Sequence, residues 1–534
     1  MLPARFKQRR TRKRLAMVLA CLLAVALAPV GSRFFAGRPR VWAARDVPVA
    51  FWAWRNDAPS EGEVSRAVEK TRASVLFMRA GQLHYEKETL QRVRAIAGRF
   101  PRGIELHLVY NSTRAFLSEF ERLDPIKLAD LISQTYSEDL ARAAQDRAEV
   151  AGLQLDLDVP TRLLPHYARI VRNLRERLPT GVKLSVTGLP TWMESKALAD
   201  LLDAVDFWIP QCYGALIPER LEQVSAISST RTVARAVERA RELNHPFYAG
   251  LSAYGYTILY DARGALIALR GDIDPARVAE DANFYLTERE PFDTEDKKDG
   301  QTTSSASEWR YVYRARADAV VEGLAVRAGE SLMLDVPSAE TLRESARAVR
   351  EGAGEKLLGI CIFRLPSETD ASTLRLEQVA SALADIAPAA STELRAELLD
   401  SKSADAHEEA QSLRLTATNQ GTTSALMGDD AFVIDVRVPA GSLRAVRLEG
   451  FSSAEALCGK VEQTHPKGED VAEPCAERRA NILRLKSKTW MSGASLSAVL
   501  NFNEDTPQTF MTETRMQTDE GREWRQEQQI TLQR

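Results

Sequence analysis

The sequence predicts an α/β protein: a (β/α)8 barrel of the TIM type with an α+β insertion after its seventh strand, followed by a C-terminal β-sandwich domain. Up to about residue 390, short β-rich runs alternate with amphipathic helical runs, as in a sheet of parallel strands. The seventh unit is much longer than the others, which indicates an insertion. Beyond residue 390 the helical pattern stops, and strand patterns separated by turn residues predict a sandwich.

The first 44 residues have the pattern of a signal peptide or signal anchor. Seven basic residues between Arg5 and Arg14 precede a 16-residue apolar run, Leu15–Val30. This pattern predicts export to the periplasm or the extracellular space. The run is just shorter than a usual membrane helix, and two candidate cleavage sites precede Pro29 and Ala44. Cleavage therefore stays open, with anchoring to the inner membrane by residues 15–30 as the alternative and the only membrane contact expected.

Charge and cysteine content narrow the classes of partner. Without the ten Lys and Arg residues of the leader, the remaining 61 basic residues face 74 acidic ones, a net charge of about −13, which argues against nucleic acid. No Cys or His spacing matches a metal site, and no cofactor motif is present, so neither is expected. Cys212 and Cys361 lie in apolar runs as buried thiols. Cys458 and Cys475 lie close together in a polar region, where a disulfide is predicted for an exported chain.

Eight strand candidates make up the barrel, which we place over residues 45–390. They are 47–54, 74–79, 104–111, 153–158, 182–188, 206–214, 247–255 and 357–365. An open doubly wound sheet is the alternative, but no glycine-rich phosphate loop supports it.

The remaining segments follow from the same patterns. A hairpin-like stretch, a polar stretch and further strand patterns between about 256 and 336 predict the α+β insertion. The polar stretch within 391–411 predicts a linker, and 412–534 is the predicted β-sandwich domain.

The segment Gly152–Pro160, GLQLDLDVP, carries the main functional signal. Side chains alternate faces in a strand, so Gln154, Asp156 and Asp158 share one face and the leucines share the other. In a barrel the polar row points inward and Asp158 stands at the C-terminal mouth, where active sites lie. Two carboxylates in one confined site repel, so one takes a proton, which suits acid–base chemistry. The structural alternative is that these acids only pair with Arg55, Arg79 or Arg364.

Other strand ends contribute candidate substrate-binding residues. Gln211 and Tyr213 share a face near the end of the sixth strand, and Asn111 ends the third. Aromatic residues at a barrel mouth can stack on sugar rings, although a single tryptophan is more often a core residue. The remaining candidates of this kind are Trp52, Trp54, Arg55, Trp192, Tyr254 and Arg364.

These residues give the region 45–390 a resemblance to the family-18 glycoside hydrolases, the chitinase-like proteins. The fourth strand of that family reads D-G-x-D-x-D-x-E, where this chain has AGLQLDLD at 151–158. The sixth strand of the family ends in Gln or Met, one residue and Tyr, matched by Gln211 and Tyr213. The seventh often reads G-L-P-x-Y-G, matched here by GLSAYG at 250–255, and an α+β insertion often follows it. The whole chain also resembles an uncharacterised bacterial domain-of-unknown-function family of exported proteins.

The resemblance implies a polysaccharide partner and assigns roles to three residues. Asp158 occupies the position of the catalytic Glu, Asp156 that of the Asp that assists the acetamido group of the substrate, and Tyr213 stabilises the reacting group. The departures are Asp158, one methylene shorter than Glu, and Gln154, which stands where the motif has an Asp two positions before Asp156. Two functions stay open: hydrolysis of an envelope or environmental polysaccharide, and binding by a catalytically inactive barrel with the sandwich as an adhesion module. A purely structural protein is a third, which predicts a plugged mouth.

Overall fold

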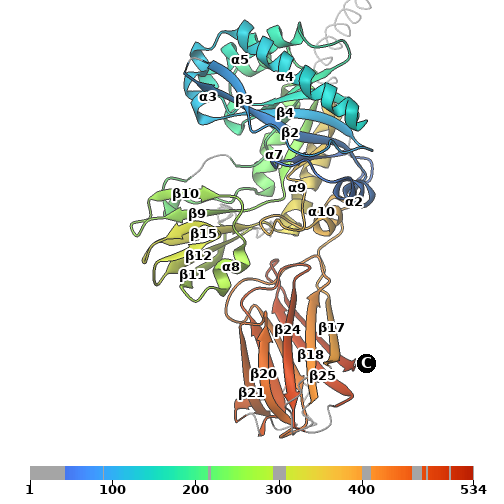
Figure 1. Cartoon of the computed structure of the whole chain (residues 1–534), viewed down its shortest axis with the longest axis vertical. Coiled ribbons are helices and arrows are strands. Elements are labelled where there is room, and N and C mark those ends of the chain that lie inside the picture. Colours follow the sequence, from blue (N-terminus) through green and yellow to red (C-terminus); the bar gives the residue numbers. More distant parts are fainter. Residues whose placement is uncertain are drawn as a thin grey trace, which may run out of the picture.

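The computed structural model describes residues 42–87, 89–214, 218–292, 308–399, 411–459, 472–476, 479–503 and 507–532. The predicted leader, with its membrane-anchor alternative, therefore lies almost entirely outside the described residues. Three units follow one another in the chain: a barrel, an insertion and a C-terminal β-sandwich (Figure 1). Among the described helices, none is long and apolar enough to cross a membrane.

The first unit is a closed barrel of eight parallel strands, which confirms the predicted fold class. Its strand order is β1-β16-β8-β7-β6-β5-β4-β2, and pairing of β1 with β2 closes the ring. The strands are β1 (Val49–Ala53), β2 (Ala73–Glu86), β4 (Glu105–Ser112), β5 (Val150–Asp156), β6 (Lys183–Gly188), β7 (Phe207–Pro210), β8 (Phe247–Ser252) and β16 (Leu357–Phe363).

The barrel has two apolar layers, one inside and one outside the strands. Leu153 and Leu155 of β5 are fully buried on the outer face, in the core shared with the helices. A separate interior cluster fills the lumen, because the alternate residues of each strand point inward. Its members include Trp52, Phe77 and Phe207.

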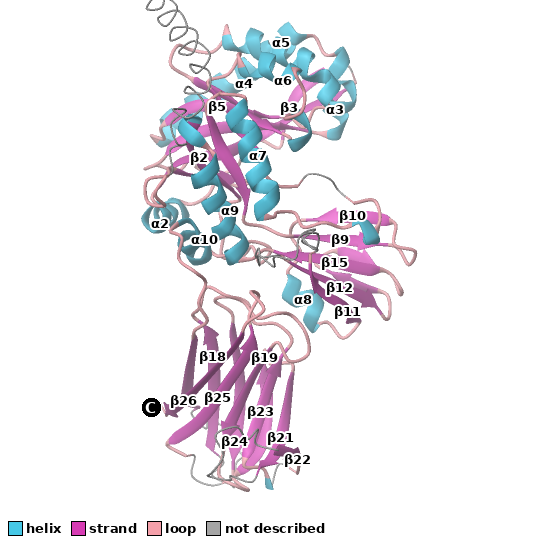
Figure 2. Ribbon diagram, turned by 180° about the vertical axis from the view of Figure 1, so that it is seen from behind, coloured by secondary structure: helices cyan, strands magenta, loops and turns pink. Residues whose placement is uncertain are grey.

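Helices surround the strands, as Figure 2 shows. They are α2 (Glu61–Thr71), α3 (Arg114–Glu119), α4 (Pro125–Asp146), α5 (Leu164–Arg175), α6 (Ala197–Leu202), α7 (Thr230–Glu242), α9 (Ala339–Gly352) and α10 (Leu376–Leu383), with one-turn 3₁₀ helices between several of them. Local signals fix their ends. Asp124 caps α4 by accepting from the Ile126 and Lys127 amides, with Pro125 in the first turn, and Ser60 forms a capping box with Glu63 at α2.

One barrel strand is longer than its sequence predicts. β2 continues to Glu86 and pairs antiparallel with β3 (Thr89–Val93), a hairpin that the sequence does not predict. Leu83, on one face of this extension, is fully buried in the outer core. Gln82 and His84 lie on the opposite face, which continues the lumen wall above the mouth.

The insertion follows β8 and contains a five-stranded antiparallel sheet of order β10-β9-β15-β12-β11. Its elements are β9 (Tyr256–Tyr260), β10 (Leu266–Arg270), α8 (Pro275–Glu280), β11 (Phe284–Pro291), β12 (Trp309–Ala315), β13 (Ala319–Val321), β14 (Leu324–Val326) and β15 (Ser331–Val336). The predicted hairpin corresponds to β9 and β10. The chain returns from β15 to the barrel through α9.

The C-terminal unit consists of two antiparallel sheets, of orders β17-β18-β24-β20 and β22-β21-β23-β19-β25-β26. Their strands are β17 (Thr392–Leu399), β18 (Gln411–Asn419), β19 (Phe432–Arg437), β20 (Leu443–Glu449), β21 (Ser453–Gly459), β22 (Ala472–Pro474), β23 (Ile482–Ser487), β24 (Ser495–Phe502), β25 (Thr509–Gln517) and β26 (Glu523–Thr531). A disulfide joins Cys458 to Cys475.

The prediction of a linker over 391–411 is wrong for its first part. Residues Thr392–Leu399 form β17, which pairs along its full length with β18. The reason is that Ala396 is fully buried in the sandwich core, although its neighbours are polar and suggest a loop. Residues 400–410 of the predicted linker lie outside the described residues.

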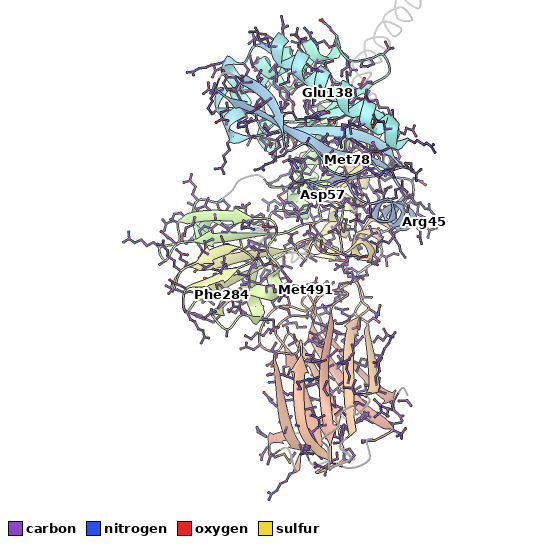
Figure 3. All side chains as sticks on the ribbon, viewed as in Figure 1. Arg45, Asp57, Met78, Glu138, Phe284 and Met491 are labelled. Atoms are coloured by element: carbon purple, nitrogen blue, oxygen red, sulfur yellow. A yellow bond between two sulfur atoms is a disulfide. The ribbon has the colours of Figure 1, made fainter. Side chains whose placement is uncertain are left out.

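The insertion and the sandwich share a packed interface. Leu426 and Met427 of the sandwich are buried in the core of the insertion, and Met491 packs against the same core. Figure 3 shows Met491 at the junction of the two units, with Phe284 in the insertion. The Trp309 indole donates to the Asp519 carbonyl (2.8 Å), which adds a hydrogen bond across this interface.

Candidate functional site

The inward row of β5 divides into a buried part and an accessible part. Gln154 is fully buried, Asp156 at the end of the strand is half-buried, and Asp158 lies exposed in the loop beyond it. Leu157 and Val159, between and after the acids, are fully buried and hold this loop against the core. The row therefore rises from the packed lumen to the open mouth.

Gln154 and Trp52 form the buried floor of the mouth, and their predicted contact with a substrate stays a prediction. The Trp52 indole nitrogen donates to Oε1 of Gln154 (2.8 Å), and Nε2 of Gln154 donates to the Ser185 hydroxyl (3.4 Å). Trp52 is only 2% exposed and Gln154 is not exposed at all. Their polar atoms are hydrogen-bonded within the protein.

Asp156 has the environment of an acid–base group. Burial, reinforced by the charge of Asp158, raises the pKa of Asp156 to about 7. Thr187 opposes this shift because its hydroxyl donates to Oδ1 of Asp156 (2.5 Å). Desolvation of its carboxyl also raises the pKa of Asp158, although the residue as a whole is exposed. Near neutral pH the pair therefore holds a proton that can be transferred.

The arginines that could neutralise these acids have other partners. Arg55 pairs with Glu63 (2.9 Å), Arg79 donates to Asn56 Oδ1 (2.7 Å), and Arg364 pairs with Asp370 (2.7 Å). Neither Asp156 nor Asp158 makes an ion pair with any residue that the structure describes. The interpretation of the acids as structural ion-pair partners of these arginines is wrong.

An aromatic wall stands beside the acids. Tyr213 is 5% exposed, and the nearby charges of Asp156 and Asp158 reinforce the effect of burial in raising its pKa. The ring of Phe363 lies 6.0 Å from Tyr213, 5.0 Å from Tyr254 and 5.9 Å from Trp54, between centroids. Tyr254 and Trp54 are half-buried, so part of each ring is accessible at the mouth.

The opposite side of the mouth offers amide groups. Asn111 of β4 pairs in register with Asp156, and Gln82 of β2 pairs in register with Asn111. Asn111 Oδ1 and Gln82 Oε1 are both buried and have no hydrogen-bond partner. Gln211, bridged to Gly250, is half-buried, and its side chain makes no hydrogen bond to a described residue. Buried polar groups rarely stay unpaired, so the oxygens of Gln82 and Asn111 call for a partner, and both residues, like Gln211, are half-buried at the mouth.

Three other predicted binding residues make contacts within the protein, and their binding roles stay predictions. Trp192 is fully buried behind β5, where its indole donates to the Val159 carbonyl (3.0 Å). Arg364 ties the barrel to the insertion by donating to the Gly271 carbonyl (2.8 Å), besides its pair with Asp370. Arg55 is held by Glu63 at the start of α2.

The sequence prediction missed Thr187, Gln82 and Phe363. Thr187 had a signal, since it shares a strand face with Ser185 in KLSVTG. Gln82 had none, because the β2 extension was not predicted. Within the described part of the chain, no group of His, Cys, Asp and Glu could hold a metal ion.

Comparison with known proteins adds a partial family match and distant structural likenesses. Residues 119–278 match the family described as Domain of unknown function (DUF3142). No curated protein matches the chain.

The structure of the Bacillus cereus spore cortex-lytic enzyme SleL is similar over 64% of this chain and 74% of its own, at 16% identity and a TM-score of 0.41. A chitinase from Chromobacterium violaceum is similar over 63% of this chain and 99% of its own, at 15% identity and a TM-score of 0.41. A family-18 N-acetylglucosaminidase from Paenibacillus barengoltzii has the same coverages, 63% and 99%, at 10% identity and a TM-score of 0.39. The barrel assignment rests on the strand pairing above.

Proposed function

We propose that this protein is an exported glycoside hydrolase acting on an envelope or environmental polysaccharide. The observation that carries the proposal is the pair Asp156 and Asp158 at the open end of a barrel, where burial raises the pKa of both carboxyls and neither has an ion-pair partner among the described residues. Active sites of such barrels lie at this end, and groups with perturbed pKa values cluster at functional sites.

The mechanism that we propose follows the family-18 resemblance of GLQLDLD. Asp158 donates its proton to the glycosidic oxygen while the bond between that oxygen and the anomeric carbon breaks. The acetamido carbonyl oxygen of the substrate attacks the anomeric carbon, so no second protein nucleophile is needed. Water then opens this intermediate and returns a proton to Asp158, which restores the starting state.

The neighbouring residues position the reacting group. Asp156 accepts a hydrogen bond from the acetamido N–H. The Tyr213 hydroxyl donates a hydrogen bond to the carbonyl oxygen that attacks the anomeric carbon. Thr187 holds the Asp156 carboxyl in place through its hydrogen bond. Trp54 and Tyr254 provide partly accessible ring faces for sugar units.

Binding without turnover is the second candidate, and one observation favours it. Asp158 is one methylene shorter than the Glu that the family uses, and it lies beyond the end of β5. A displacement of a proton donor by about 1 Å can cost roughly a hundredfold in rate.

Release of reducing ends from a polysaccharide panel, including chitin oligomers and peptidoglycan, tests the proposal. The full chain is compared with Asp158→Asn and with Asp200→Asn, an exposed acid on α6 as the matched control. Release that only Asp158→Asn abolishes supports hydrolysis with Asp158 as the acid. Glycan binding without release, unchanged by Asp158→Asn, leaves the binding barrel as the function.

Export is part of the proposal and rests on the leader together with the disulfide Cys458–Cys475, which suits an oxidising compartment. Fractionation of cells into cytosol, periplasm, membrane and medium tests it. Protein confined to the cytosol contradicts it.

A further inference from the structure

A polar groove lies on the rim of the barrel beside the candidate site. It occupies about 520 Å³ between the β2–β3 hairpin and the segment after β4, and its lining includes Gln82, His84, Arg94, Thr113 and Arg114. β3, α3 and the insertion lie on the same side of the barrel in both ribbon views (Figures 1 and 2). The hairpin that bounds the groove therefore lies on the same side of the barrel as the insertion.

The groove continues the wall that carries Asp156. Gln82, Asn111 and Asp156 are in register on the neighbouring strands β2, β4 and β5. Adjacent strands are about 4.8 Å apart, so Gln82 lies about 10 Å from Asp156 across the wall. A sugar chain with one unit over the acids can thus place a neighbouring unit in the groove.

Two arginines give the groove a positive charge. Arg94 and Arg114 are exposed, and neither makes an ion pair with a described residue. Arg92, on the other face of the hairpin, is by contrast paired with buried Asp139. Burial lowers the pKa of Arg79 at the barrel wall, and the nearby charge of Arg94 adds to this shift.

Among the described residues, the acid Glu86 contacts His84 of the groove lining. Glu86 lies 3.8 Å from His84, between Oε2 and Nε2, and its side chain is 60% exposed. The other ring nitrogen of His84 is hydrogen-bonded to Thr113 Oγ1 (2.9 Å), which fixes the ring against the wall. Two guanidinium groups without an ion-pair partner among the described residues thus line the groove, in a chain that is acidic overall beyond its leader.

The unpaired amide oxygens complete the chemistry of the site. Gln82 Oε1 and Asn111 Oδ1 are buried acceptors without partners, and sugar hydroxyls are suitable donors. Arginine recognises carboxylates through paired N–H donors. A ligand that satisfies both kinds of group carries hydroxyls and a carboxylate on one ring.

We propose that this groove is a subsite for a carboxylate-bearing sugar unit, which makes the substrate an acidic polysaccharide. Arg94 and Arg114 bind the carboxylate, while Gln82 and Asn111 accept hydrogen bonds from the ring hydroxyls. The inference rests on the proposed glycan site and deepens it by naming the class of substrate. The carboxylate belongs either to a uronic acid or to a lactyl ether on an amino sugar.

Calorimetric binding to the full chain carrying Asp158→Asn, which prevents turnover, tests the subsite. The probes are an oligogalacturonate, the same oligomer after reduction of its carboxylates to alcohols, a peptide-free peptidoglycan oligomer with lactyl groups, and a chitin oligomer. Each is measured with Arg94→Gln/Arg114→Gln and with Arg235→Gln, an exposed arginine in α7, as the matched control.

We expect one acidic oligomer to bind about tenfold more tightly than its neutral counterpart, since hydrogen bonds to charged groups are stronger than neutral ones. The double arginine variant abolishes this preference, and Arg235→Gln keeps it. Which acidic oligomer shows the preference identifies the source of the carboxylate.

The outcomes separate the two proposals. Equal affinity for acidic and neutral oligomers, or equal losses for both in the double variant, overturns the acidic subsite and leaves the glycan site standing. Failure of every oligomer to bind overturns both. An acidic preference together with no release by the chain with Asp158 intact supports the subsite and contradicts hydrolysis.

Discussion

Two pairs of carboxylic acids in this molecule differ in what surrounds them. Asp156 and Asp158 are half-buried and exposed, and Thr187 is the hydrogen-bond donor to Asp156. Asp335 of β15 and Glu308 are 2% and 3% exposed, at the contact between the insertion and the segment before α7.

The second pair is bonded to the backbone around it. The Ile227 amide donates to Asp335 Oδ2 (2.7 Å), the Ser228 amide donates to Glu308 Oε2 (3.4 Å), and the two carboxyls are hydrogen-bonded to each other. Burial raises the pKa of Asp335 to about 7, as it does for Asp156. A raised pKa alone therefore does not mark an active site, and access to a ligand separates the two pairs.

The largest expected difference between the pairs is in turnover. Asp156→Asn should lower kcat by about 10²–10⁴-fold on a substrate that the protein hydrolyses, because it removes a group that acts on the reacting atoms. Glu308→Gln, the matched change in the other pair, should leave kcat within about twofold. Steady-state kinetics of both variants measures this. Equal losses of kcat would contradict the assignment of different roles to the two pairs.

For the stability of the fold, the buried pair should matter more than an exposed carboxylate. Asp335→Ala should lower the free energy of unfolding by about 2–4 kcal/mol, because the Ile227 amide and Glu308 lose a buried partner. Asp318→Ala removes a similar bond to the Ala328 amide on the exposed surface and should cost less than about 1 kcal/mol. Chemical denaturation measures both, and a cost for Asp318→Ala as large as that for Asp335→Ala would contradict the structural role of the buried pair.

The mouth pair should also make stability depend on pH. The folded-state pKa of Asp156, about 7, exceeds its unfolded value, so the folded state binds more protons between pH 4 and 7. Stability therefore falls as pH rises through this window. Asp156→Asn removes this loss. The free energy of unfolding of the variant, relative to that of the unmodified chain, should therefore increase by about 1–3 kcal/mol from pH 5 to pH 8. Denaturation at the two pH values measures the gain, and a difference that is independent of pH would refute it.

The smallest expected effect is a change in the pKa of Asp156 when its hydrogen bond from Thr187 is removed. Thr187→Val removes a donor that favours the ionised carboxyl, so the pKa of Asp156 should rise above about 7, by roughly one unit or less. NMR titration of the Asp156 carboxyl carbon measures the change. Thr191→Val, at a threonine without this contact, is the control, and an unchanged or lowered pKa in Thr187→Val would contradict the geometry.

The sequence predicted the barrel well because each of the eight strands contains a short β-rich run, although β2 extends beyond its run. It also placed Gln154, Asp156 and Asp158 on one face, since alternation is a local property of a strand. Depth in the lumen is different, because it depends on how neighbouring strands are staggered. Trp52 and Trp54 look equivalent in AFWAWR, yet one lies in the floor and the other at the mouth.

Two other features were not predicted, because they too depend on tertiary structure more than on local sequence. Trp192 looked like a mouth residue, but the 3₁₀ turn at Pro190–Trp192 directs it into the core behind β5. The β2–β3 hairpin carries alternating polar residues on its accessible face, and one such short run does not stand out from a loop. The groove residues Gln82 and Arg94 could therefore not be predicted.

The packed interior has a consequence for how a long substrate meets the protein. Phe77, Phe207 and Ile209 fill the lumen below the Trp52–Gln154 floor, so the barrel is a dead end rather than a tunnel. A polymeric substrate of the proposed function would lie across the rim and not pass through the barrel. Cutting in the middle of a chain then needs no free end to be threaded, and the fragments leave sideways by the route through which the chain arrived.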